Sequence, residues 1–345
     1  MITENLLNSI NRGRAGLNVG LSTGLPKLDM LTYGIQRKWL TVIAGDTGSG
    51  KSSLALYSQV YQPFQQYMEN KELKINFLIF SFEMSAEVLM AKMLCTYIYE
   101  TFHKVISYEE ILSLTGTLSD EDYELVLQSQ PWLEEFEKHC EIIDKPVSAK
   151  ALYGICKEWS RKFGTYKELE KTDDFTKEEY LPKDPKQYLI VLVDHIKLLS
   201  VSAGNTAKQE IDTACDYLIH FRNKCSFTIT IVQQLNRNFK SMARRTEGGG
   251  QFNLLQLDDL SDSSGPANAA EVVIGIFHPF REKMSRCEGY DVRQLKDRIR
   301  LVQILKQRFG QADRSVGCTF FGEVNLWRNL PLPSEITDYE PLCQL

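Results

Sequence analysis

The chain has 345 residues, of which 43% are hydrophobic and 25% charged, a globular composition with room for one large α/β domain or two small ones. We expect neither a secretory signal nor a transmembrane helix. No basic segment precedes an apolar stretch at the start, and no apolar run approaches about 18 residues. The net charge of −5 argues against nucleic-acid binding by the whole surface. Eight cysteines without a C-x-x-C pair predict reduced thiols in a cytoplasmic protein rather than disulfides or zinc sites.

Apolar runs of strand length alternate with amphipathic helical segments, which predicts an α/β fold with a mostly parallel twisted sheet and helices on both faces. The expected strands are 40–44, 76–81, 140–143, 188–193, 227–232 and 271–277, with a closing pair at 300–306 and 316–321. One expected helix begins at 53, and others cover 85–97, 148–162 and 206–224. Residues 107–138 also have a helical pattern, with a helix start at 119–122. Residues 164–187 are mixed in charge and flanked by proline, so we expect an exposed insertion loop there.

Residues 45–52 read Gly-Asp-Thr-Gly-Ser-Gly-Lys-Ser, a complete G-x-x-x-x-G-K-[ST] loop between an expected strand and an expected helix. In that setting the glycines let backbone N–H groups surround nucleotide phosphates, and the positive end of the following helix faces them. Lys51 is expected to reach the β and γ phosphates, and Ser52 to hold Mg²⁺. The sequence therefore predicts ATP and Mg²⁺ as ligands, held by Gly45, Asp46, Thr47, Gly48, Ser49, Gly50, Lys51, Ser52 and Ser53.

Three polar residues follow expected strands, where an ATP-hydrolysing sheet needs them. Asp194 ends a continuous apolar run and can hold the Mg²⁺ shell beside the phosphate loop. Glu83 can orient attacking water as a base, with a simple helix-start carboxylate as the alternative interpretation. Gln234 can sense the γ-phosphate through its amide, with an ordinary polar strand end as the alternative.

Positive charge is concentrated in two segments. Residues 236–251 have a local charge of +3, and residues 291–315 have a local charge of +4. If nucleic acid is a partner, it should therefore meet a confined basic strip rather than a broad face. Two solvated charged segments are the alternative.

A series of motifs resembles the motor domain of DnaB-type replicative helicases. In chain order they are Gly24-Leu25-Pro26-Lys27-Leu28-Asp29, the phosphate loop, Ser81-Phe82-Glu83-Met84-Ser85, Val193-Asp194-His195, Gln234-Leu235-Asn236-Arg237 and Lys306-Gln307-Arg308-Phe309-Gly310. The resemblance extends from about residue 20 to about residue 321. It implies a RecA-like P-loop fold, a hexameric ring and ATP-driven 5′→3′ movement on single-stranded DNA.

The resemblance also implies a role for each matching residue. Glu83 becomes the catalytic base, Asp194 the Mg²⁺-linked acid and Gln234 the sensor. Lys306 and Arg308 become residues that complete the site of the neighbouring subunit, where an arginine stabilises charge on the transferred phosphoryl group.

In a RecA-like ring the loops after the Asp194 and Gln234 strands face the central channel, here roughly 200–208 and 237–251. The second loop has three glycines that let it follow a moving backbone. We expect Arg244, Arg245 and Lys240 to contact DNA phosphates there.

The resemblance divides the chain into a motor domain at 21–327, a C-terminal tail at 328–345 and an N-terminal segment at 1–20. That segment is expected to be either a linker or a short docking helix with Leu6, Leu7 and Ile10 on its apolar side. Bacterial relatives usually have an N-terminal collar that contacts primase. Fewer than about twenty residues precede the motor here, so we expect no collar, as in a phage or mobile-element helicase. A primase or helicase loader remains an expected kind of partner.

The family's late Asp-Leu-Arg-Glu-Ser-Gly element is present only as residues 259–265, without its arginine. This departure weakens the prediction of DNA contacts at that place. Two other classes stay open: a RecA-fold recombination or remodelling ATPase, and a nucleotide switch. The combination of Glu83, Gln234, Lys306 and Arg308 argues against a switch, because a switch needs neither a base nor a residue acting on a neighbour.

Overall fold

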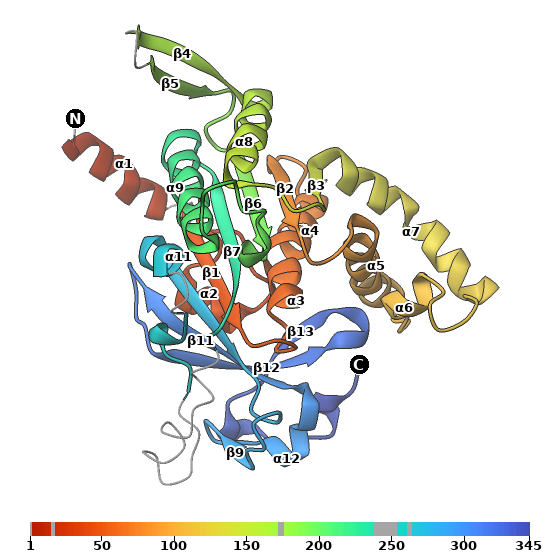
Figure 1. The fold of residues 1–345 in the computed structure, drawn as a ribbon. Coiled ribbons are helices and arrows are strands. Elements are labelled where there is room, and N and C mark those ends of the chain that lie inside the picture. Colours follow the sequence, from red (N-terminus) through yellow and green to blue (C-terminus); the bar gives the residue numbers. More distant parts are fainter. Residues whose placement is uncertain (1, 15–17, 172–175, 237–253, 261–263) are drawn as a thin grey trace.

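The computed structural model describes residues 2–14, 18–171, 176–236, 254–260 and 264–345. Within these ranges, nine strands form one sheet in the order β13-β12-β11-β8-β1-β7-β6-β2-β3 (Figure 1). In chain order they are β1 (Leu40–Gly45), β2 (Ile75–Ser81), β3 (Cys140–Ile143), β6 (Tyr188–Asp194), β7 (Thr228–Gln234), β8 (Val272–Phe277), β11 (Ile299–Gln307), β12 (Arg314–Phe321) and β13 (Leu326–Asn329). The strands from β8 to β3 are parallel, and β11, β12 and β13 extend the sheet in antiparallel pairs. The predicted α/β class with a mostly parallel sheet is confirmed.

Helices cover both faces of this sheet. The longer ones are α5 (Ala86–Phe102), α7 (Asp120–His139), α8 (Ala149–Phe163) and α9 (Ala207–Cys225). The helix α1 (Ile2–Arg14) projects from the body of the molecule (Figure 1). The shorter ones are α2 (Pro26–Thr32), α3 (Lys51–Leu56), α4 (Gln62–Glu69), α6 (Tyr108–Ile111), α11 (Ser264–Ala269) and α12 (Val292–Leu295). Side chains of α8 and α9 pack on one face, and those of α3, α4, α5 and α7 pack on the other.

The sequence of β6 shows why the sheet is buried on both sides. Leu189, Val191 and Val193 belong to the hydrophobic cluster on the α8–α9 face. The residues between them, Ile190 and Leu192, belong to the cluster on the opposite face. Successive strand residues point to opposite faces, so a central strand needs an uninterrupted apolar run.

Polar residues begin the long helices at the predicted places. The side chains of Ser85, Ser119, Ser148 and Thr206 each accept a hydrogen bond from a backbone N–H three residues later. The helix start predicted at 119–122 is confirmed, because α7 begins at Asp120. The earlier part of the predicted helical segment 107–138 forms only the short α6, with a break before α7. Gly116 lies in that break with a φ of +148°, a conformation that side chains rarely adopt.

The insertion at 164–187 is a β-hairpin, and the prediction of a loop is wrong. Strands β4 (Gly164–Lys171) and β5 (Thr176–Pro182) pair antiparallel and project from the end of α8 (Figure 1). Tyr166 and Tyr180 are opposite each other in this pair. The Tyr180 hydroxyl donates to the Ser160 carbonyl (2.9 Å), and the Tyr166 hydroxyl lies 2.7 Å from Ser160 Oγ. These two rings anchor the hairpin on α8. The mixed charge of the segment gave no indication of this packing.

Both end segments of the chain contain regular secondary structure. The N-terminal segment contains the helix α1, whose Leu6, Leu7 and Ile10 are 58%, 55% and 48% exposed. The expected boundary at residue 327 falls inside β13, so the sheet continues beyond the predicted motor domain. Among the described residues, no helix is both long enough and apolar enough to cross a bilayer.

Candidate active site

The candidate site forms where several strands end at one edge of the sheet. Gly45, the last residue of β1, is paired with Gln234 at the end of β7 and with Ile276 near the end of β8. Ser81 at the end of β2 is paired with Asp194 at the end of β6. The loops that follow these strands therefore lie along the same edge, as expected for the ligand-binding edge of an open parallel sheet.

The phosphate loop connects β1 to α3 in the predicted strand–loop–helix arrangement. Gly48 and Gly50 have φ angles of +72° and +97°, which other residues rarely adopt. A Cβ on Gly45 would lie only 2.3 Å from Ser49 Oγ. The glycine pattern of the loop is therefore required by backbone conformation and by space.

Lys51 and Ser49 have the properties expected of phosphate-binding residues. Lys51 is 7% exposed, and it forms no hydrogen bond or ion pair with any described residue. Ser49 Oγ is also buried without a hydrogen-bond partner in the described part of the chain. A buried cation and a buried hydroxyl without partners are costly unless a ligand satisfies them. Both groups fit an anionic phosphate in the loop.

Ser52 and Asp194 lie together beside Lys51. Ser52 Oγ donates to Asp194 Oδ1 over 3.1 Å, and Asp194 is only 4% exposed. Burial raises the pKa of Asp194 to about 6, against the opposing effect of the hydrogen bond from Ser52. A hydroxyl and a carboxylate oxygen are ligands that Mg²⁺ accepts beside nucleotide phosphates, so the pair fits that ion.

Glu83 and Gln234 lie at the same edge as this pair. The Phe82 N–H donates to the Asp194 carbonyl (2.7 Å), which holds the segment before Glu83 against the end of β6. The exposed Glu83 is close enough for its charge to raise the pKa of Asp194 further. Gln234 Nε2 donates to Thr47 Oγ1 in the phosphate loop (2.8 Å). The structure thus brings the predicted base, acid, sensor and loop together.

Two arginines that the sequence reasoning did not assign to the site contact the phosphate loop. Arg281, after β8, donates to the Thr47 carbonyl, and Arg300 in β11 donates from Nε to the Ser49 carbonyl over 2.9 Å. The sequence signalled Arg300 only as one of several basic residues in the segment 291–315. Its contact with the loop depends on the pairing of β11 with β8, which a sequence pattern does not specify.

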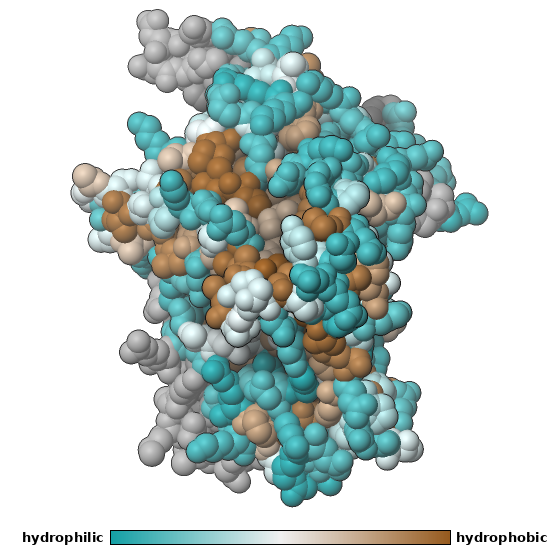
Figure 2. Space-filling view, turned by 90° about the vertical axis from the view of Figure 1, so that its right-hand side faces the viewer, coloured by the Kyte–Doolittle hydropathy of each residue, from teal (hydrophilic) through white to brown (hydrophobic). Residues whose placement is uncertain are grey.

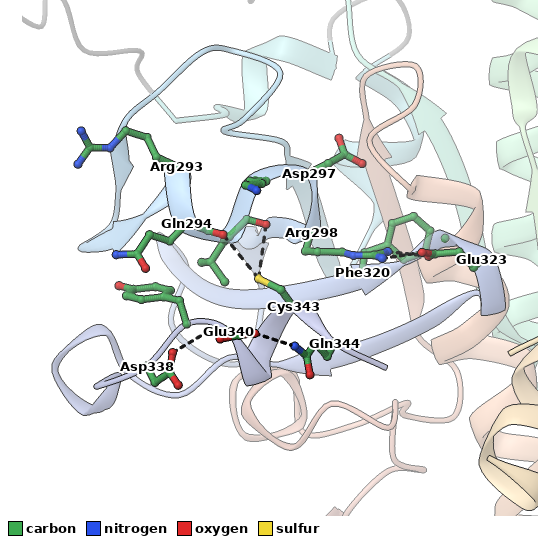
Figure 3. A pocket seen from close by; sticks show the side chains of 14 residues that line it. Arg293, Gln294, Asp297, Arg298, Phe320, Glu323, Asp338, Glu340, Cys343 and Gln344 are labelled. Carbon is green, nitrogen blue, oxygen red and sulfur yellow. Dashed lines mark hydrogen bonds and ion pairs between the residues drawn. The ribbon is translucent and has the colours of Figure 1, made fainter. Parts of the chain in front are cut away.

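A cavity of about 990 Å³ lies on the β11–β12 side of the loop, between the α12 region and the C-terminal residues 338–344 (Figure 3). Arg298 and Glu323 form a bidentate ion pair at its wall, with N–O distances of 2.6 and 2.5 Å (Figure 3). Phe320 also lines the cavity, and its Cδ1 lies 3.6 Å from the position that a Cβ on Gly50 would take. The cavity and the phosphate loop therefore share Phe320 as a common wall.

Lys306 and Arg308 lie at the opposite edge of the sheet. Gln307, between them, is paired with Val272 at the start of β8, which is paired in turn with Thr41 at the start of β1. The end of β1 is four residues farther along, roughly 13 Å at about 3.3 Å per residue. These two cations are therefore not brought to the phosphate loop of their own chain.

Both cations are held by neighbouring groups at that edge. Lys306 Nζ donates to the Ala267 and Asn268 carbonyls (2.9 and 2.8 Å). Arg308 forms an ion pair with the buried Glu271 (2.9 Å) while its own side chain remains 45% exposed. The predicted DNA-contact residues Arg244, Arg245 and Lys240 lie outside the described residues.

A phosphate loop at the end of a central parallel strand, with an acid and a candidate base at neighbouring strand ends, is the arrangement of a P-loop nucleotide-binding domain of RecA-like fold. Residues 20–329 match the DnaB-like helicase C-terminal domain family. The chain belongs to that family.

Individual relatives agree with this assignment. The chain is 22% identical over 322 residues to the replicative DNA helicase DnaC of Bacillus subtilis (strain 168), and the match covers 92% of this chain and 58% of that protein. The chain thus spans somewhat more than half the length of that curated relative. Its fold is similar to a solved ATPase domain, with a TM-score of 0.70, 19% identity, and coverage of 96% of this chain and 99% of that domain. It is also similar to a DnaB-like replicative helicase whose structure describes interactions with primase, with a TM-score of 0.68, 19% identity, and coverage of 96% and 67%.

Proposed function

We propose that this chain is the motor of an ATP-dependent replicative DNA helicase, which assembles into a hexameric ring and moves 5′→3′ on single-stranded DNA. The observation that supports this most is the meeting of Lys51, Ser52, Asp194, Glu83 and Gln234 at one edge of the sheet, in a member of the DnaB-like family. Phosphate binding, metal binding and water activation are thereby available in one site.

Each of these side chains has a definite task in ATP hydrolysis. Lys51 binds the β and γ phosphates, and Ser52 with Asp194 would hold Mg²⁺, which neutralises charge on the phosphates when bound. Glu83 orients a water molecule and accepts its proton at a carboxylate oxygen. Gln234 is bonded to Thr47 of the loop, so a change at the phosphates reaches the end of β7 directly.

The cavity of Figure 3 is suited to the base and ribose of the nucleotide. Glu83 follows β2, and Asp194 and Gln234 are the last residues of β6 and β7. These three strands all lie on one side of β1 in the sheet. If the γ-phosphate faces those residues, the base must extend to the other side, where Phe320 connects the loop to the cavity. Phe320 stacks on Trp327 with ring centroids 4.6 Å apart, which holds one aromatic wall rigid.

The placement of Lys306 and Arg308 supports a shared site between subunits. They cannot reach the phosphate loop of their own chain, and Glu271 fixes the half-exposed Arg308 at the surface. Glu271 is itself fixed by Arg222 (2.9 Å) and by the Leu40 N–H (2.7 Å). A rigidly held, exposed arginine is suited to stabilise charge in a neighbour's active site.

Exposed apolar surface also supports assembly. The apolar side chains of α1 lack a covering element among the described residues, since Leu6, Leu7 and Ile10 are about half exposed. The face with α5, α6 and α7, turned to the viewer in Figure 2, shows hydrophobic patches separated by hydrophilic surface. We propose that α1 docks on a neighbouring copy, where its burial adds to the contact made by Arg308.

Single-stranded DNA is the proposed track of this motor. From the sequence, Arg244, Arg245 and Lys240 remain the proposed phosphate contacts, in the segment that comes after β7 in the chain. A primase or a helicase loader is a proposed partner, by analogy with the DnaB-like helicase whose structure describes primase interactions.

Single-stranded DNA should stimulate ATP hydrolysis by the wild-type protein, because the proposed DNA-contact segment comes directly after Gln234 and Asn236 in the sequence, and Gln234 is the proposed sensor. The measurement is the steady-state ATPase rate with a homopolymeric oligonucleotide, with a blunt duplex and with no DNA. We expect a higher rate with the single strand than with the duplex, and a stimulation that weakens as salt rises. A rate that no DNA changes at low salt would contradict a DNA motor.

A further inference from the structure

Arg300 is a buried arginine whose hydrogen bonds all go to backbone carbonyls. It is the second residue of β11 and is 3% exposed. Its Nε donates to the Ser49 carbonyl over 2.9 Å. One terminal nitrogen donates to the Asp297 and Ile299 carbonyls at 2.5 and 2.8 Å. The guanidinium carbon lies 5.4 Å from the centre of the Phe320 ring. Arg300 thus links the start of β11 rigidly to the phosphate loop.

Arg300 forms no ion pair with any described residue, although the nearby charge of Asp297 acts on it and partly offsets the effect of burial on its pKa. The other arginine of this turn, Arg298, is neutralised by Glu323, while Asp297 faces His278 at 3.2 Å. Burial lowers the pKa of Arg300 to about 10, so the group still remains charged at neutral pH. A buried cation whose hydrogen bonds go only to carbonyls favours an anion nearby. The phosphate loop that it touches is where such an anion would bind.

The bond to Ser49 also controls the direction of a backbone donor. In a trans peptide, the carbonyl and the following N–H point in opposite directions. Because the Ser49 carbonyl points to Arg300, the Gly50 N–H points away from Arg300. Within the described residues, no group accepts a hydrogen bond from that N–H. Gly50 also has a φ of +97°, which allows the turn.

We propose that Arg300 is a positioning residue for the nucleotide phosphates: it holds the Ser49 carbonyl from outside, so that the Gly50 N–H is directed at the phosphates, and it adds a fixed positive charge behind the loop. This inference rests on the proposed nucleotide binding by the same loop. Its chemistry recognises a diphosphate or triphosphate group and does not depend on the base.

The test compares nucleotide affinities of Arg300→Gln, Arg300→Lys and the wild-type protein by isothermal titration calorimetry, with ATP, ADP and inorganic pyrophosphate in Mg²⁺ buffer. Arg300→Gln should weaken binding of all three by roughly tenfold to a hundredfold, the range for a lost hydrogen bond from a charged donor. Lysine keeps the positive charge but lacks the planar guanidinium with its several N–H donors. Arg300→Lys should therefore bind the three ligands more tightly than Arg300→Gln and less tightly than wild type. In hydrolysis assays Arg300→Gln should raise KM far more than it lowers kcat.

Arg37 provides a matched control, because it also donates to a carbonyl (Lys186) and lies 4.6 Å from the centre of an aromatic ring (Tyr188). It lies beside the start of β6, at the edge opposite the phosphate loop. Arg37→Gln should therefore leave all three affinities unchanged.

The outcomes separate this inference from the proposed function. A folded Arg300→Gln variant that binds ATP and pyrophosphate within about twofold of wild type would overturn the inference alone. If that variant does not fold, Arg300→Lys decides by the same criterion. If neither variant folds, Arg300 serves the fold and the inference is wrong. Failure of the wild-type protein to bind ATP at all would instead overturn the proposed nucleotide site.

Discussion

Replacing Glu83 with glutamine should slow ATP hydrolysis by at least about 10²-fold, the scale of a lost general base. Glutamine keeps the size of the side chain and its ability to hydrogen-bond water, but it cannot accept a proton. Affinity for ATP should be almost unchanged, because the phosphates are bound by Lys51 and the loop rather than by Glu83. The measurement is single-turnover hydrolysis together with ATP titration.

Glu87 provides the control for this experiment. It is also an exposed glutamate, in the first turn of α5, only four residues after Glu83. Glu87→Gln makes the same change of charge without removing a group from the strand-end cluster, so hydrolysis should stay close to the wild-type rate. Near-normal turnover by Glu83→Gln would show that the base assignment is wrong and that Glu83 is a helix-start carboxylate.

Replacing Arg308 with alanine should lower ATP hydrolysis by about 10³-fold or more, as expected for an arginine that stabilises the transferred phosphoryl group. Binding of ATP should persist, because Arg308 lies at the edge of the sheet opposite its own phosphate loop. Arg161 is an exposed arginine on α8 that pairs only with Glu158 among the described residues. Arg161→Ala should therefore keep wild-type activity.

Mixing Arg308→Ala with Lys51→Ala protein distinguishes action on a neighbour from action within one chain. Each variant alone is defective in a different half of the shared site. In mixed rings, some interfaces combine an intact Lys51 from one chain with an intact Arg308 from the next. We expect partial recovery of ATPase activity after mixing. No recovery, or wild-type activity that is unaffected by dilution of a strictly monomeric protein, would contradict a shared site.

The parts of the site that could be predicted depend on local sequence. The phosphate loop is a contiguous motif, and Lys51 and Ser52 follow from its spacing alone. Asp194 and Gln234 could be found because each ends an apolar run, and parallel strands end at a common edge. Their contacts with Ser52 and with Thr47 agree with that reasoning.

The features that were missed depend on contacts between distant parts of the chain. Arg300 reaches Ser49 across 251 positions of sequence, and only the pairing of β11 with β8 brings it there. The hairpin β4–β5 was mistaken for a loop because its charges are mixed, whereas Tyr166 and Tyr180 decide its structure by packing on α8. Short strands such as β13 have too few residues to show a clear alternation of apolar and polar positions.

Unwinding of a forked DNA substrate tests the central claim most directly. The substrate has a labelled duplex with two single-stranded tails and a biotin–streptavidin block on one strand at a time. The wild-type protein with ATP and Mg²⁺ should separate the strands and should stop at a block on the strand with the 5′ tail, while a block on the other strand should have little effect. Glu83→Gln should separate none of the duplex. Brisk ATP hydrolysis without strand separation, or arrest only by a block on the 3′-tailed strand, would contradict a 5′→3′ helicase.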